Sequence, residues 1–297
     1  MPVILALLLL LTFTSPCPAS PRLDLSPEER AWLDEHKDSL TLSFDRAFPP
    51  IEFEKPDGSF AGLSADLISR VEERLGVTFR KQSAPWTQVL EGLRNGSTAV
   101  APAIVNNEER SEYTLFTRPY ARIPLVIVTS RNVKGMLSVD DLTGMRVAVV
   151  RGYASATLIK NAGRGRFTVM EVATIREGLR DVSFGVADAF VESLAVAAWH
   201  IDQEKLPNLR VAGDLEVTQD LSIGISKKYP LLASAVGKAL EAIPESGKKS
   251  IVERWIQLST SILSKQTLDA MRLAALFTAA ILVILTVVAW ALSRKLR

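Results

Sequence analysis

Strand-like and helix-like segments alternate along residues 39–258, and this alternation constrains the fold more than any other feature of the sequence. Leu40, Leu42 and Phe44 follow the two-residue period of a strand. Residues 64–75 and 86–94 carry apolar side chains at helical spacing, and a glycine ends each segment. Apolar residues predict further strands starting at Val77 and over 99–105. The pattern predicts an α/β domain.

The second half of this region repeats the order of the first. Strands are predicted over 147–150, 167–172 and 187–191, with helices around Leu158 and over 175–182. The tetrapeptide EGLR occurs at 91–94 and again at 177–180, each time followed by a glycine and an apolar strand. This internal similarity predicts two lobes of one architecture.

Two further segments predict the connections between these lobes. Residues 125–128 and 221–225 are candidate crossover strands, with hinges near 120–124 and 218–221. Helices are predicted over 231–243 and 251–262, and residues 20–38 form a short charged lead-in.

The N-terminal end resembles an export signal. Residues 1–13 are apolar, and small residues before position 20 favour cleavage after Ala19. We therefore expect a signal peptide over 1–19, with lipidation of Cys17 as an alternative.

Residues 273–292 contain twenty consecutive positions without a charge, enough to cross a bilayer once. Arg294, Lys295 and Arg297 follow, and the positive-inside rule places them in the cytoplasm. We expect a periplasmic domain anchored in the bacterial inner membrane by one C-terminal transmembrane helix, with residues 259–272 as the juxtamembrane segment and 293–297 as a cytoplasmic tail.

Charge and composition exclude several function classes. Of the 35 Lys and Arg residues, three lie in the last four positions, so residues 20–272 hold 32 basic and 33 acidic side chains. This near-neutral body lacks the basic surface of a nucleic-acid-binding protein. One cysteine and two distant histidines, His36 and His200, do not predict a disulfide or a zinc site. No phosphate-loop, metalloprotease or serine-hydrolase motif occurs, so the sequence predicts no cofactor, no metal and no catalytic residue.

Several ordered motifs resemble the type II periplasmic solute-binding proteins, solute-binding family 3. The resemblance covers about residues 39–258, and its motifs are FPP at 48–50, DG at 57–58, GLSADL at 62–67, ERS at 109–111, FTRPY at 116–120, LTGMRVAV at 142–149 and ADAFV at 187–191. It implies two Rossmann-like lobes joined by two crossover strands, which close on a small ligand. Lobe 1 would comprise 39–121 and 222–258, and lobe 2 would comprise 122–221.

The resemblance also implies positions for the ligand pocket. Phe48 and Trp86 match aromatic walls, with core packing as the alternative, and Asp45 matches a position at the ligand's far end, with loop capping as the alternative. Arg110 matches the arginine that binds the ligand carboxylate, for which a guanidinium fork is suited. The ligand-binding residues implied in lobe 2 are Arg151, Tyr153, Ser155 and Ser193.

This sequence departs from the family pattern at three places. Pro102, Ala103 and Val105 replace small hydroxyl residues before the arginine, and Tyr153 follows the glycine of lobe 2. Ser193 stands where an acidic residue would pair with a ligand ammonium; Glu192 is adjacent, but neighbouring strand residues point to opposite faces. The resemblance therefore implies that the carboxylate clamp is kept and the ammonium partner is lost.

The architecture resembles the periplasmic sensor modules of bacterial receptors, in which an output domain follows the membrane helix. Here SRKLR follows, so a truncated receptor and a stand-alone anchored binder both stay open. We expect a sensor-type module for a small carboxylate or an amino acid, acting as a homodimer or with a separate signalling or transport partner. The alternatives are the binding component of an amino-acid importer and an enzyme on the same fold, such as a dehydratase or a lytic transglycosylase lacking its catalytic domain.

Overall fold

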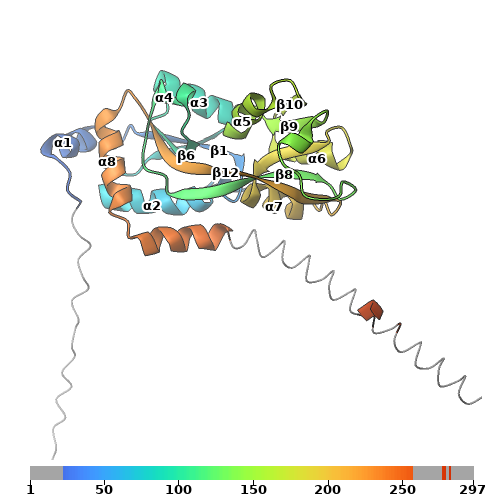
Figure 1. The fold of residues 1–297 in the computed structure, drawn as a ribbon. Coiled ribbons are helices and arrows are strands. Elements are labelled where there is room, and N and C mark those ends of the chain that lie inside the picture. Colours follow the sequence, from blue (N-terminus) through green and yellow to red (C-terminus); the bar gives the residue numbers. More distant parts are fainter. Residues whose placement is uncertain (1–22, 257–275, 279–280, 282–297) are drawn as a thin grey trace, which may run out of the picture.

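The computed structural model describes residues 23–256, 276–278 and 281. Residues 27–256 hold the described helices and strands of two lobes that lie side by side, with two long strands running between them (Figure 1). Eight strands of one mixed sheet follow the order β10-β9-β11-β8-β12-β6-β1-β5, and β7 pairs with β12. A separate small sheet has the order β2-β3-β4.

Lobe 1 is built around parallel strands. Strand β1 pairs in parallel with β5 on one side and with β6 on the other. The strands of this lobe are β1 (Thr41–Asp45), β2 (Ala47–Phe48), β3 (Glu52–Glu54), β4 (Phe60–Ala61), β5 (Arg80–Ala84), β6 (Val100–Val105) and β7 (Thr114–Phe116). Its helices are α2 (Leu63–Leu75), α3 (Trp86–Asn95), α4 (Glu108–Ser111) and α8 (Pro230–Glu241), and α1 (Pro27–His36) of the lead-in segment packs against α8.

Local sequence explains where these helices begin and end. Ser26 and Glu29 form a reciprocal capping box at the start of α1, which satisfies two free backbone amides. Helix α2 buries Leu67, Ile68 and Val71 on one face and ends at Gly76, whose φ of 71° suits a left-handed cap. The predicted helices over 64–75 and 86–94 are therefore confirmed.

Lobe 2 lies between the two long strands in the sequence. Strand β9 pairs in parallel with β10 and with β11. Its elements are the 3₁₀ turn η1 (Asp140–Leu142), β9 (Arg146–Val150), α5 (Ala154–Gly163), β10 (Thr168–Val172), α6 (Ile175–Ser183), β11 (Ala189–Ser193) and α7 (Leu194–Gln203). Both lobes thus alternate strands and helices, as the repeated sequence pattern predicts.

The crossovers are β8 (Ala121–Ser130) and β12 (Leu209–Ser226), which pair antiparallel with each other. Both are longer than the predicted segments 125–128 and 221–225. The expected hinge segments face each other, since Ala121 pairs with Leu221 and Pro124 with Thr218. The pairing register shifts between Asp214 and Thr218, so the ladder is interrupted next to these segments.

Apolar residues of both lobes join in one large buried cluster. It includes Phe44, Phe79 and Leu93 of lobe 1 and Phe190 of lobe 2. A second cluster includes Ile127 of β8, Val147 of β9 and Ile159 of α5. These cores position the strand ends at which the site is formed.

Two elements have bounds that differ from the sequence prediction. The strand expected to start at Val77 begins instead at Arg80, because the amide of Phe79 donates to Oε1 of Glu72 and not to a neighbouring strand. The helix expected over 251–262 is observed over 245–256, where its described part ends.

The signal peptide at 1–19 and most of the expected membrane segment at 273–292 lie outside the described residues. Among the helices that the structure describes, none combines the length and apolar character needed to cross a bilayer.

Candidate functional site

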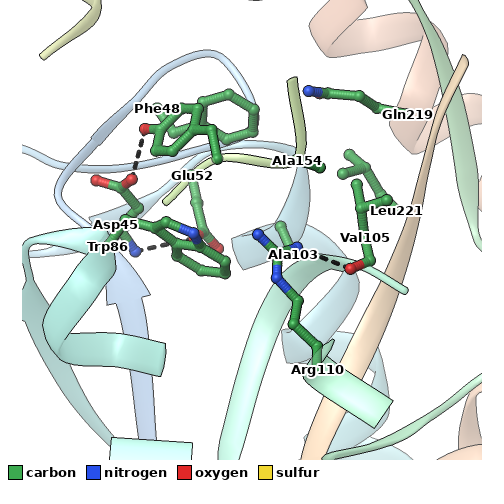
Figure 2. Close-up of a pocket in the computed structure, with 11 residues that line it drawn as sticks. Asp45, Phe48, Glu52, Trp86, Ala103, Val105, Arg110, Ala154, Gln219 and Leu221 are labelled. Carbon is green, nitrogen blue, oxygen red and sulfur yellow. Dashed lines mark hydrogen bonds between the residues drawn. The ribbon is translucent and has the colours of Figure 1, made fainter. Parts of the chain in front are cut away.

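A cavity of about 30 Å³ lies between the lobes, at the carboxyl ends of parallel strands (Figure 2). Asp45 ends β1 and Val105 ends β6, whereas Tyr153 follows β9 of the other lobe. Ligands of α/β proteins commonly bind at this edge of the sheet. The lining residues are Asp45, Phe48, Glu52, Trp86, Ala103, Val105, Arg110, Tyr153, Ala154, Gln219 and Leu221.

Arg110 lies in the short helix α4, directly after β6. Its guanidinium donates to the Val105 carbonyl at 2.7 Å and to the Gly152 carbonyl at 2.9 Å. The side chain stacks over Trp86, with Cζ 5.4 Å from the ring centroid, and the residue is only 3% exposed. Burial lowers the pKa of Arg110 to about 10, because the cation has lost most of its hydration.

Three hydrogen bonds join the lobes across the cavity. The Tyr153 hydroxyl donates to Oδ2 of Asp45 at 2.6 Å, and Trp86 Nε1 donates to the Gly152 carbonyl at 2.9 Å. The Arg110 bond to the same carbonyl is the third. We call these five residues, Asp45, Trp86, Arg110, Gly152 and Tyr153, the inter-lobe clasp. It holds the lobes together around the cavity.

Asp45 caps a turn and also lines the cavity. Its Oδ1 accepts from the amide of Ala47, which caps the following turn, while Oδ2 faces lobe 2 and accepts from Tyr153. Burial raises the pKa of Asp45, although both hydrogen bonds favour the charged form.

Aromatic rings form the wall of the cavity. Phe48 meets the Tyr153 ring edge-on at a centroid distance of 5.3 Å, and Trp86 meets the same ring edge-on at 6.3 Å. Phe48 also belongs to the large core cluster, so it packs in the core and lines the cavity. Such rings offer a rigid apolar surface to a ligand.

Two buried glutamates were not among the predicted site residues. Glu52 lines the cavity, and its Oε1 accepts from the amide of Asp45 at 2.9 Å. Burial raises the pKa of Glu52 well above its ordinary value, and the neighbouring Asp45 carboxylate adds to this shift. Burial likewise raises the pKa of Glu192 to about 7. One oxygen of each, Oε2, has no hydrogen-bond partner among the described residues.

Sequence signals for these residues were weak. Glu52 follows a buried Ile51 in a loop-rich segment, and nothing local predicts its complete burial. Gln219 lines the cavity from the crossover β12, in a segment expected to act only as a hinge. Glu192 was expected to face away from Ser193, and the structure buries both residues completely.

The remaining lobe 2 residues of the predicted site lie outside the cavity lining. Arg151 is largely exposed in an adjacent groove and pairs with Glu171 at 3.4 Å. Ser155 is fully buried in α5, and its Oγ has no hydrogen-bond partner in the described part of the chain. Ser193 occupies the N-cap position of α7 without a side-chain capping bond, and its amide donates to Oε1 of Glu192. The structure thus brings together Asp45, Phe48, Trp86, Arg110 and Tyr153, but not Arg151, Ser155 or Ser193.

The described residues contain no cluster of three or more His, Cys, Asp or Glu side chains arranged to hold a metal ion. The chemistry available at the cavity is therefore that of one cation, several buried acceptors and three aromatic rings.

Comparison with known proteins gives a consistent family assignment. Residues 40–258 match the family described as "Bacterial extracellular solute-binding proteins, family 3". "Virulence sensor protein BvgS" of Bordetella pertussis is 27% identical over 235 residues, which span 77% of this chain and 19% of that protein. The chain thus spans about a fifth of the length of this relative.

A second relative is matched over most of its length. "Probable amino-acid-binding protein YxeM" of Bacillus subtilis is 26% identical over 216 residues, 71% of this chain and 81% of that protein. Among solved structures, the periplasmic VFT2 domain of Bordetella pertussis BvgS superposes with a TM-score of 0.70 at 26% identity, covering 78% of this chain and 98% of that domain.

Proposed function

This chain belongs to the bacterial extracellular solute-binding proteins, family 3, and from that membership we propose that it is a membrane-anchored periplasmic sensor module that closes on a small carboxylate or amino-acid-like ligand. In this proposal, lobe 1 comprises 39–121 and 222–258, and lobe 2 comprises 122–221. The match to the BvgS sensor supports the sensor role, and the uncharged segment at 273–292 supports the anchor.

The buried positive charge of Arg110 is the observation that supports a carboxylate ligand. Its guanidinium donates to two main-chain carbonyls and forms no salt bridge with a carboxylate among the described residues. A buried cation without an anionic partner is costly, so an anion at this point is stabilised. A ligand carboxylate would supply that anion and the coplanar oxygens that a guanidinium fork recognises.

Ligand entry requires the lobes to separate. A cavity of about 30 Å³ has room for roughly one water molecule and not for an amino acid. In our proposal, the ligand carboxylate takes the place of the Gly152 carbonyl on Arg110 while the lobes are open, and the lobes then close on the larger complex. Binding thereby shifts an open–closed equilibrium.

A thermal-shift screen of residues 20–272 against small carboxylates and amino acids tests the proposal. A compound that raises the melting temperature of the parent protein but not of Arg110→Ala would support it. Arg151→Ala is the matched control, because Arg151 is exposed beside the cavity. Stabilisation that persists unchanged in Arg110→Ala would refute the assigned clamp.

The second candidate function is substrate binding for an amino-acid importer. It is favoured by the match over 81% of YxeM, whose name describes a probable amino-acid-binding protein. Co-purification distinguishes the two functions: an importer component should bind a transport permease, whereas a sensor module should bind a signalling partner or a second copy of itself.

A further inference from the structure

Neighbouring residues of strand β3 face two different parts of the molecule. Glu52 is fully buried and lines the cavity. Phe53, the next residue, packs instead against two tryptophans, Trp199 and Trp255. This alternation follows from the two-residue period of a strand. Adjacent residues of β3 therefore contact the cavity on one face and an aromatic cluster outside the cavity on the other.

The first tryptophan belongs to lobe 2. Trp199 lies in α7, and its ring centroid is 6.3 Å from that of Phe53 at an interplanar angle of 38°. This contact joins the lobes outside the cavity lining, because neither ring is among the residues that form it.

The second tryptophan belongs to the helix that follows α8. We call residues 245–256 the exit helix; in Figure 1 it runs from α8 beneath α2 towards α7. The Trp255 ring meets Phe53 edge-on at 6.2 Å, and its Nε1 donates to Oδ2 of Asp66 in α2 at 2.9 Å. Arg254 also pairs with Asp66, at 3.2 Å, so the exit helix is fixed to lobe 1.

We propose that Trp199, Phe53 and Trp255 form an aromatic relay that couples the closure of lobe 2 to the position of the exit helix. Separation of the lobes removes Trp199 from Phe53 but leaves the Phe53–Trp255 and Asp66 contacts within lobe 1. The Phe53 ring then loses one of its two aromatic neighbours, and Trp255 packs against a less constrained surface. Closure therefore orders the exit helix, and opening loosens it.

This inference rests on the proposed lobe closure, but its test needs no ligand. Hydrogen–deuterium exchange of the full chain in detergent micelles reports the opening of the exit helix directly. Trp199→Leu should raise the exchange rate of the amides at 245–256 between about twofold and tenfold, the loss expected for one aromatic pair. Phe184→Leu is the control, because Phe184 is a lobe 2 ring that is 79% exposed.

A double-mutant comparison separates a relay from general destabilisation. In a Phe53→Leu background, Trp199→Leu should cause no further increase in exchange at the exit helix. An unchanged rate in the Trp199→Leu variant, or an equal increase with and without Phe53, would overturn the relay.

Opening of the clasp gives a second test, which is needed if Trp199→Leu also loosens the packing of α7 on β8 and β11. Tyr153→Phe removes the bond to Asp45, and it should accelerate exchange at the exit helix only when Phe53 is present. Equal acceleration in both backgrounds would also overturn the relay. Neither result affects the ligand screen of Arg110→Ala, so failure of the relay and failure of the proposed function are distinguishable.

Discussion

The Tyr153 hydroxyl of lobe 2 donates a hydrogen bond of 2.6 Å to the Asp45 carboxylate of lobe 1. Both side chains are more than nine-tenths buried, and the bond spans the cavity at which a ligand would enter. In the proposed lobe closure, this bond contributes directly to the free-energy difference between the open and the closed form.

Tyr153→Phe should shift this balance towards the open form. Loss of a hydrogen bond to a charged group costs about 1.5–3 kcal/mol, which is enough to change the open population many-fold. Small-angle scattering should show a larger radius of gyration for Tyr153→Phe than for the parent. Tyr229→Phe is the control, because the Tyr229 hydroxyl donates to Gly96 within lobe 1. Equal radii for all three proteins would contradict the role of the clasp.

Arg110→Ala should weaken ligand binding by roughly 2–4 kcal/mol, as expected when one partner of a desolvated charge pair is removed. Calorimetry with a compound from the thermal-shift screen measures this loss. Arg110→Lys keeps the charge but not the planar fork, and it should recover only part of the affinity. Parent-like binding by Arg110→Ala would show that the carboxylate is held elsewhere.

The buried glutamates predict a stability that falls as pH rises. The pKa of Glu192 is raised from 4.5 to about 7 by burial, so the folded state binds more protons than the unfolded state between these values. The stabilisation of the folded state by protonated Glu192 is complete below pH 4.5 and is lost as the pH rises to about 7. The free energy of unfolding falls by about 3 kcal/mol in total over this range. The raised pKa of Asp45 and of Glu52 acts in the same direction.

Urea unfolding from pH 5 to pH 8 measures this dependence. Glu192→Gln should flatten the curve across that range, whereas the exposed Glu54→Gln should leave its slope unchanged. A parent slope that survives Glu192→Gln would assign the titration to another group.

Membrane topology is checked independently of the ligand. With Arg294, Lys295 and Arg297 following the uncharged segment, residues 20–272 should lie outside the cytoplasm. A phosphatase fused after Ile262 should be active, and one fused after Arg297 should be inactive. The reverse pattern would end both the sensor and the importer proposals.

Sequence periodicity predicted the elements whose signals are local. Helices α2 and α3 carry apolar residues at helical spacing and end at glycines, so their existence follows from short-range pattern. Strand β5 was misplaced because its residues are mostly polar and exposed, as in an edge strand, while the apolar Val77 and Phe79 precede it. The crossovers β8 and β12 were too short in the prediction because their length depends on pairing over about 90 residues of sequence.

In the candidate site too, some residues could be predicted from the sequence and others could not. Family motifs led to Asp45, Phe48, Trp86, Arg110 and Tyr153, which the structure brings to one cavity. The raised pKa values of Glu52 and Glu192 result from burial in the tertiary structure. This burial leaves no pattern in the neighbouring sequence. An acidic residue in a loop or at a strand end is ordinarily predicted to be exposed.

The Gly152 carbonyl accepts from both Trp86 and Arg110, so lobe 2 contributes a main-chain atom to the clasp. No side-chain substitution can delete that acceptor. Residue 152 has a φ of 77°, a conformation that favours glycine. Replacement of Gly152 by another residue would therefore strain the backbone. Changes in selectivity across related proteins should therefore accumulate on the donor side, at the positions of Trp86 and Arg110, while the acceptor stays constant.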